Sequence, residues 1–155
     1  MRDSPQEQRC FFVTAVGANR RNLFQTERNC ELFLNLIREY RQLNRFALHS
    51  FVLMPDHLHA ILTPAPEISL EKAMQFIKGR FSFELKKQFG DDREVWQKGY
   101  NEERLHSRED FMVRSKYIDE NPVRAGLATH ANAFSWSSAG KTADVDPIPE
   151  LLSRG

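Results

Sequence analysis

Two apolar, β-rich runs separated only by a turn constrain the fold of this chain most strongly. The first run covers residues 46–54 (FALHSFVLM) and the second covers residues 57–63 (HLHAILT). Pro55 and Asp56 lie between them, and both residue types favour turns. Pro64 ends the second run, because proline cannot donate to a sheet ladder. The sequence therefore predicts two strands paired as a tight β-hairpin.

A strand and a helix are expected before this hairpin. Residues 9–16 (RCFFVTAV) form a short apolar run, rich in strand-forming residues, that ends at Gly17. A basic loop follows, and a helix is expected to begin near Thr26. Its buried stripe consists of residues that recur at helical spacing, namely Phe33, Leu36, Ile37, Tyr40 and Leu43.

A second helix, a fourth strand and a third helix are expected after the hairpin. Ser69 is a candidate N-cap for the second helix, which ends near Gly90. Residues 94–106 are irregular at first and then predict the fourth strand. Ser107 caps the third helix, which should end near Asn121 because the proline that follows disfavours helical geometry in the residue before it.

The resulting order, β-α-β-β-α-β with one further helix, indicates an α+β protein. It suits a ferredoxin-like antiparallel sheet with helices packed on one face, and the additional C-terminal helix carries Tyr117. With 155 residues, the chain is expected to form a single domain over residues 1–140. Residues 141–155, which include prolines at 147 and 149, are expected to be a loosely attached tail.

The composition excludes several classes of protein. Hydrophobic residues make up 41% of the chain and charged residues 28%, as in an ordinary globular domain. No apolar run is long enough to span a membrane, and the polar N-terminus lacks the apolar core of a signal peptide, so we expect a cytoplasmic protein. Cys10 and Cys30 are too few for a disulfide framework and are expected to be reduced and packed.

The distribution of charge is more informative than the net charge, which is +1. Residues 9–45 contain seven arginines and no lysine, against three acidic residues. The guanidinium group binds phosphate in a bidentate manner and stacks on bases, so this bias suits nucleic acid. A solvated charged face would explain the same composition, so the bias alone does not decide between the two.

A histidine pair in the second strand of the hairpin is the strongest local signal for chemistry. Side chains alternate along a strand, so His57 and His59 project from one face while Leu58 points to the other. Two neutral imidazoles held this way form half of a site for a divalent metal. A structural or merely exposed pair would have the same spacing.

The third helix offers the other half of such a site. Tyr117 and Asn121 are four residues apart, so they lie on one face of that helix. A lone tyrosine usually packs with its hydroxyl satisfied. Here Asn121 offers a carbonyl oxygen to a metal, and a hydroxyl nucleophile one turn away could reach the substrate of the same ion.

These residues resemble two motifs of the HUH transposases. Residues 54–59 (MPDHLH) resemble the histidine–hydrophobic–histidine motif, and residues 117–127 (YIDENPVRAGL) resemble the tyrosine motif of the REP-associated branch. The resemblance covers roughly residues 11–138 in family order. Asp119 departs from the pattern, because many relatives carry histidine or another residue there, and it is assigned no role. Three shorter segments also match: residues 95–100 (VWQKGY), 108–111 (REDF) and 135–138 (SWSS).

The resemblance implies a single-tyrosine transposase that cuts and rejoins single-stranded DNA near imperfect palindromic hairpins. His57 and His59 would match the two histidine ligands, Asn121 the polar third ligand, and Tyr117 the nucleophile that forms a 5′-phosphotyrosine. The metal would be Mg²⁺ or Mn²⁺, acting as a Lewis acid on the scissile phosphate. Mn²⁺ should bind more tightly, because imidazole suits it better.

Single-stranded or hairpin DNA is the partner that the resemblance implies, without a membrane, and relatives occur both as monomers and as homodimers. Hairpin recognition would use cations for phosphates and aromatic rings for unpaired bases. Trp96 and Tyr100 are candidates either for base stacking or for core packing. The candidates for DNA contacts are Arg20, Arg21, Lys78, Arg80 and Arg124.

Two alternatives stay open on the sequence alone. A metal-dependent hydrolase of small molecules could also carry two such histidines and would recruit Asp56 or His106, but it leaves the arginine bias and the tyrosine–asparagine pair unexplained. A non-catalytic hairpin-binding protein descended from a transposase would bind DNA without needing Tyr117. The group that activates the tyrosine is also open between Arg114, Lys116 and a metal-bound water.

Overall fold

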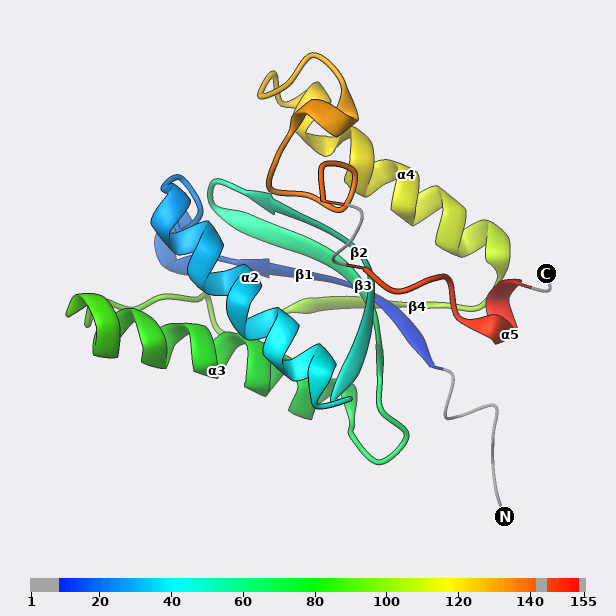
Figure 1. Ribbon diagram of the computed structural model, residues 1–155, viewed down its shortest axis with the longest axis horizontal. Helices are drawn as coiled ribbons and strands as arrows, with labels where there is room; N and C mark the ends of the chain where they lie inside the picture. The colour runs from blue at the N-terminus through cyan, green and yellow to red at the C-terminus, as the bar shows by residue number, and fades with distance from the viewer. Residues whose placement is uncertain (1–8, 142–144, 154–155) are drawn as a thin grey trace.

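A four-stranded antiparallel sheet organises the chain (Figure 1). The structure is a computed structural model and describes residues 9–141 and 145–153. The strand order is β2-β3-β1-β4, which is the ferredoxin-like order, and the predicted fold class is confirmed. The strands are β1 (Cys10–Val16), β2 (Phe46–Met54), β3 (His57–Pro64) and β4 (Asn101–Leu105).

The predicted hairpin is confirmed as the pair β2–β3, with Met54 opposite His57 at the turn. β1 lies at the centre and pairs with β3 on one side and with β4 on the other. Thr14 is the Cα partner of His59 and also of Asn101, so it connects the hairpin to the edge strand. The pairing between β2 and β3 shifts between Leu48 and Ser50, an irregularity typical of a β-bulge.

Three long helices flank the sheet, and each begins where the sequence predicts. They are α2 (Glu27–Gln42), α3 (Leu70–Phe89) and α4 (Arg108–Arg124), and three short helices, η1 (Ala18–Arg20), η2 (Ala131–Ala133) and α5 (Glu150–Ser153), complete the described elements. The side chains of Thr26, Ser69 and Ser107 each accept a hydrogen bond from the backbone three residues on, which satisfies an N–H that the first turn cannot pair. α3 ends at Gly90, whose φ of 68° places it in the left-handed region that glycine adopts without strain.

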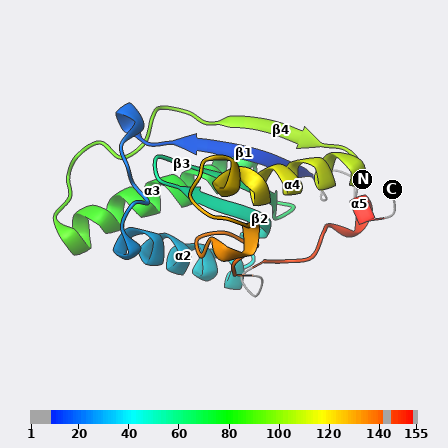
Figure 2. The same ribbon diagram turned by 90° about the horizontal axis from the view of Figure 1, so that it is seen from above.

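The sheet separates two apolar layers (Figures 1 and 2). α2 and α3 cover one face and form the larger core with Val13, Leu58 and Leu62. α4 covers the other face, where Phe12 and Ile61 pack with Ile118 of the helix. Adjacent residues of one strand therefore serve different layers, as the period of two requires.

Two expectations about helix ends are wrong. α2 ends at Gln42, and Leu43 is 53% exposed instead of completing the buried stripe. α4 continues through Pro122 to Arg124 instead of ending near Asn121. Pro122 is buried and lies in the last turn, where it removes one backbone hydrogen bond of the helix. Asn121 consequently lies within helical backbone.

Residues 145–153, which belong to the segment expected to be loosely attached, return along the sheet. The Asp146 carboxylate accepts hydrogen bonds from Arg41 Nε at 3.0 Å and Nη2 at 2.8 Å, and from the Leu48 backbone N–H at 2.8 Å. Leu152 is 5% exposed in the layer beneath α4. This part of the segment is therefore anchored, and residues 142–144 and 154–155 lie outside the described residues.

Among the described residues, no helix has the length and apolar character needed to cross a membrane.

Candidate active site

The sheet face beneath α4 brings together the histidine pair and the tyrosine predicted from the sequence. The ring centroids of His57 and His59 are 4.8 Å apart, and the rings of His59 and Tyr117 are 5.4 Å apart. Phe12 of β1 stacks on His59 at 5.4 Å and meets the edge of Tyr117 at 6.1 Å. Strand alternation and the docking of α4 therefore place the rings of Phe12 and His59 against the tyrosine, with His57 on the other side of His59.

Both histidines are held through the same ring nitrogen. His57 Nδ1 donates to Asp56 Oδ1 at 2.7 Å, and His59 Nδ1 lies 2.8 Å from the hydroxyl oxygen of Thr14. When Nδ1 carries the proton, the lone pair of Nε2 is available to a metal. Partners of this kind fix the tautomer and the orientation of metal-binding histidines.

The electrostatics around His59 favour neutral imidazole. Burial, followed by the charges of His57 and Arg114, lowers the pKa of His59 to about 4. His59 is thus uncharged at neutral pH, the form in which it can be a ligand. Burial opposes the charged form of Asp56, but its bond to His57 and the charges of His57 and Arg20 outweigh burial and lower the pKa of its carboxyl group.

Two arginines lie over the ring of Tyr117. The Arg124 guanidinium carbon is 4.7 Å from the ring centroid, and Arg124 Nη2 donates to the Tyr117 carbonyl oxygen at 3.2 Å. The Arg114 guanidinium carbon is 5.9 Å from the same centroid and 5.0 Å from that of Phe12. Arg114 is held by Glu103 of β4, with Nη2 at 2.7 Å from Oε1. Both cations therefore have fixed positions beside the tyrosine.

Asn121 lies one turn beyond Tyr117 on the same helix and is half-buried. Within the described part of the chain, its side chain has no hydrogen bond to another residue, so its carbonyl oxygen is available to a ligand. Over the same residues, no group of three or more His, Cys, Asp or Glu side chains could hold a metal. An ion at His57 and His59 would therefore need an amide, water or substrate oxygen as its next donor. The imidazole nitrogens would bind a divalent transition metal and the oxygens suit Mg²⁺ or Mn²⁺, so the identity of the ion stays a prediction.

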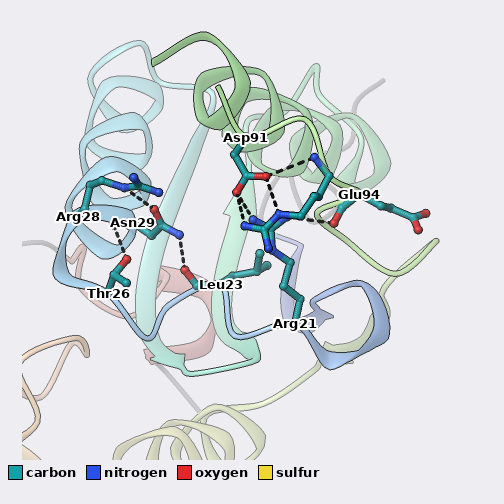
Figure 3. Close-up of polar contacts among 8 residues, drawn as sticks. Arg21, Leu23, Thr26, Arg28, Asn29, Asp91 and Glu94 are labelled. Carbon is teal, nitrogen blue, oxygen red and sulfur yellow. Dashed lines mark hydrogen bonds and ion pairs between the residues drawn. The ribbon is translucent and has the colours of Figure 1, made fainter. Parts of the chain in front are cut away.

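The other candidate DNA-binding residues occupy different environments. Arg20 is 61% exposed at the end of the sheet where His57 lies, and its Nε is 3.0 Å from Asp56 Oδ2. Arg21 is largely buried, ion-paired with Asp91 and bonded to the Glu94 carbonyl oxygen (Figure 3). Arg80 bonds Glu39 at 2.8 Å and Glu84 at 2.9 Å. Lys78 donates to the carbonyl oxygens of Gln97 at 3.1 Å and Gly99 at 2.5 Å. Direct DNA contacts by these side chains, and by Arg124, stay predictions.

Trp96 and His49 have packing roles, and His106 lies away from the histidine pair. Trp96 is 8% exposed, packs against Phe24 and Phe81, and donates from Nε1 to the Lys78 carbonyl oxygen at 3.1 Å. His49 is buried, and its Nε2 lies 2.9 Å from the Thr63 hydroxyl. His106 follows β4 at the end where Leu105 pairs with Cys10, far along the sheet from His59.

Sequence reasoning missed Thr14. Its only signal was its position in the first strand, where the period of two places it on one face with Cys10 and Phe12. Finding its contact with His59 required the pairing register of β1 and β3. The role of Asp56 was also missed, since it binds the imidazole of His57 on the side away from Nε2.

Comparison with known proteins gives a family match over most of the described chain. The sequence pattern of the family described as "Transposase IS200 like" matches residues 10–121, which include His57, His59, Tyr117 and Asn121. Two curated relatives are transposases for insertion sequence element IS200, one from Salmonella typhimurium strain LT2 and one from Salmonella typhi. Each is 39% identical to this chain over 51 residues, which are 29% of this chain. The matched region spans about a third of each relative's length, 34%.

Solved structures agree on the fold. A REP-associated tyrosine transposase bound to a REP hairpin superposes with a TM-score of 0.73 and 22% identity, covering 92% of this chain and 85% of that one. A Deinococcus radiodurans R1 protein with a provisional assignment as a transposase superposes with a TM-score of 0.55 and 14% identity, covering 72% and 88%. At these identities the likeness concerns the arrangement of the strands and helices.

Proposed function

Because this chain belongs to the IS200-like transposase family, we propose that it cuts and rejoins single-stranded DNA through Tyr117. A divalent metal, Mg²⁺ or Mn²⁺, would be held by His57, His59 and Asn121. The observation that carries the proposal is the 5.4 Å approach of the Tyr117 ring to His59, whose Nδ1 is bound by Thr14. A nucleophile and a ligand thus face the same small region of the sheet.

The reaction proceeds by transfer of the phosphoryl group to the tyrosine. Tyr117 Oη loses its proton and attacks the scissile phosphorus, and the bond from phosphorus to the 3′ oxygen of the preceding nucleotide breaks. The 3′ oxygen takes up a proton, and the other product is a 5′-phosphotyrosine. A 3′-hydroxyl of another strand then attacks this intermediate and releases Tyr117, so rejoining needs no nucleotide cofactor.

The residues around the proposed metal hold the two histidine ligands in a fixed orientation and keep His59 uncharged. Asp56 and Thr14 hold the imidazoles by Nδ1, and the low pKa of His59 keeps it neutral. A bound Mg²⁺ or Mn²⁺ would stabilise charge on the phosphoryl oxygens. Asn121 would contribute an uncharged oxygen, so the set of three ligands carries no negative charge.

Arg124 and Arg114 favour the reactive arrangement of Tyr117. Arg124 bonds the carbonyl oxygen of the tyrosine and stacks on its ring, which limits the rotation of the side chain. Arg114, fixed by Glu103, places a second cation beside the ring.

We propose hairpin DNA as the substrate of this chain, because the REP-associated transposase with the same fold is bound to a REP hairpin. Arg20, exposed beside the histidine end of the sheet, would contact the strand near the scissile phosphate. The protein would act as a monomer or a homodimer.

The test is formation of a covalent protein–DNA adduct. End-labelled hairpin oligonucleotides copied from repeats that flank the gene are incubated with the protein and Mg²⁺ or Mn²⁺, and the products are separated on a denaturing protein gel. A labelled band at the position of the protein is expected only with metal. Tyr117→Phe should abolish the band, and His57→Ala should reduce it strongly.

Matched controls separate the alternatives. Tyr40→Phe removes a tyrosine hydroxyl on the opposite side of the sheet and should leave the adduct unchanged. Tight hairpin binding without any adduct would favour the non-catalytic binding protein. Absence of both DNA binding and adduct would favour a hydrolase of small molecules.

A further inference from the structure

A groove beside the edge strand offers chemistry that the proposed mechanism does not use. It lies between α3 and the loop that enters β4, and its volume is about 410 Å³. We infer that this groove binds an unpaired nucleobase of the DNA strand and so adds sequence specificity close to the cutting site, an inference that rests on the proposed function for its substrate. The lining residues that matter are Glu71, Gln75, Lys78, Gly79, Gly99 and Tyr100.

The walls of the groove suit a flat ring. Tyr100 contributes a half-buried aromatic side chain, and unpaired bases stack on such rings in single-stranded nucleic acid sites. Gly79 and Gly99 line the same space without side chains. A Cβ added at either glycine would meet no atom within 4 Å, so the space in front of the backbone is open.

The polar groups suit the edge of a base better than a phosphate. The Glu71 carboxylate accepts hydrogen bonds from exocyclic amino groups and repels phosphate, and the Gln75 amide both donates and accepts. Burial, followed by the charges of Glu102 and Glu71, raises the pKa of Tyr100, so its hydroxyl keeps its proton as a donor. These groups can therefore distinguish one base from another.

Lys78 fixes the floor of the groove. Its ammonium group donates to the carbonyl oxygens of Gln97 and Gly99, which holds the loop immediately before Tyr100. Partial burial lowers the pKa of Lys78. Lys78 thereby positions the segment 95–100, which carries Tyr100.

The groove lies within reach of a strand bound at the histidines. Tyr100 precedes Asn101, which pairs with Thr14, and Thr14 pairs with His59. Two strand spacings separate His59 from Asn101, about 10 Å in a sheet. β4 ends the strand order, so no further strand of the described chain lies beyond it. Tyr100 packs against the core beneath α2 and α3, so the groove lies on the opposite face of the sheet from Tyr117, and a DNA strand would enter it by passing around the edge strand β4.

The experiment measures binding of fluorescein-labelled oligo(dA), oligo(dC) and oligo(dT) by anisotropy, without metal so that no cutting occurs. Tyr100→Ala should weaken binding of the preferred oligonucleotide about five- to hundredfold, the range expected when one stacked base is lost. Gly79→Leu should weaken it similarly by filling the groove, and it does not threaten the fold, because leucine is a better helix former than glycine. Gly79→Ala is the matched control and should bind like the parent protein. Gln75→Ala should change the ranking of the three oligonucleotides.

Binding by Gly79→Leu at the parent's affinity for all three oligonucleotides would overturn the inference, even if Tyr100→Ala proved unfolded. A parent protein that binds none of the three would overturn it as well. The adduct assay on the same proteins keeps the two proposals apart. If groove variants lose binding selectivity while the parent forms no adduct, the groove is supported and the tyrosine chemistry is rejected. If the parent forms the adduct while groove variants keep their binding selectivity, the groove alone is rejected.

Discussion

Arg21 allows a test between a DNA-binding role and a structural role. The sequence suggests that it contacts DNA, whereas its contacts in the structure indicate that it stabilises the fold. Its side chain is only 16% exposed and is ion-paired with Asp91, which is 8% exposed and also pairs with Arg93 (Figure 3). Arg21 joins the loop after β1 to the segment after α3. We expect Arg21→Gln to destabilise the fold and to leave phosphate binding nearly unchanged.

The magnitude follows from the carboxylate. Side-chain bonds from Arg93, with further bonds from Arg21, outweigh burial and lower the pKa of Asp91 from 3.8 to about 2. A shift of that size corresponds to roughly 2 kcal/mol of stability. Arg93 is 72% exposed, so solvent screens its part. Adding the hydrogen bond from Arg21 to Glu94, we expect Arg21→Gln to cost about 1–2 kcal/mol at neutral pH.

The sign of the pH dependence is fixed by the direction of this shift. The folded carboxyl group has the lower pKa, so its stabilising contribution is complete above the unfolded value of 3.8 and is lost as pH falls toward about 2. The difference in free energy of unfolding between the parent and Arg21→Gln should therefore shrink below about pH 4.

Two measurements on the same variants decide the matter. Urea denaturation gives the free energy of unfolding, and hairpin affinity at several salt concentrations gives the number of phosphate contacts, each worth about 0.9 in the logarithmic slope. Arg20→Gln is the matched control, since Arg20 is 61% exposed, and it should lower the salt slope with little loss of stability. If Arg21→Gln had the same free energy of unfolding as the parent while the slope of its hairpin affinity against salt fell by about 0.9, the assignment of Arg21 to the fold would be refuted.

Three further changes have expected outcomes. Thr14→Val removes the partner of His59 Nδ1 and should weaken Mn²⁺ binding about 10–100-fold by calorimetry, with the melting temperature retained. Folding lowers the pKa of His59 from 6.5 to about 4, so between these pH values the unfolded chain binds a proton that the folded chain does not. The parent protein should therefore lose about 3 kcal/mol of its free energy of unfolding as pH falls from 6.5 to 4, and His59→Gln should not show this loss in urea denaturation. Gly17→Ala would place a Cβ 2.5 Å from the Arg21 carbonyl oxygen, and thermal unfolding should show a loss of about 1–3 kcal/mol.

The elements were predictable because their signals are local. The hairpin turn at Pro55 and Asp56, the N-caps and the apolar stripes each depend on neighbouring residues, and the structure has them where the sequence indicates. The alternation of His57 and His59 also needs no tertiary information. The prediction that Leu43 is buried was wrong because α2 ends one residue earlier, so Leu43 no longer continues the apolar stripe that faces the core.

Features that depend on register were not predictable. Thr14 meets His59 only through the pairing of β1 with β3, and Arg21 meets Asp91 across 70 positions of sequence. Arginine composition indicated an affinity for phosphate but could not separate Arg20, which is exposed, from Arg21, which is enclosed by its neighbours. The roles of Tyr117 and Asn121 in DNA cutting stay predictions that the adduct assay tests.

The packing of α4 bears on how DNA strands would be exchanged. The helix that carries the tyrosine also seals an apolar layer, with Phe111 at 6% and Ile118 at 0% exposure. Re-exposing two such side chains costs about 3–6 kcal/mol, so a helix lifted off the sheet would be a rare species at equilibrium. In the proposed mechanism, each strand end would then travel to a tyrosine that stays on the sheet, and the order of cutting and joining would depend on the mobility of the nucleic acid.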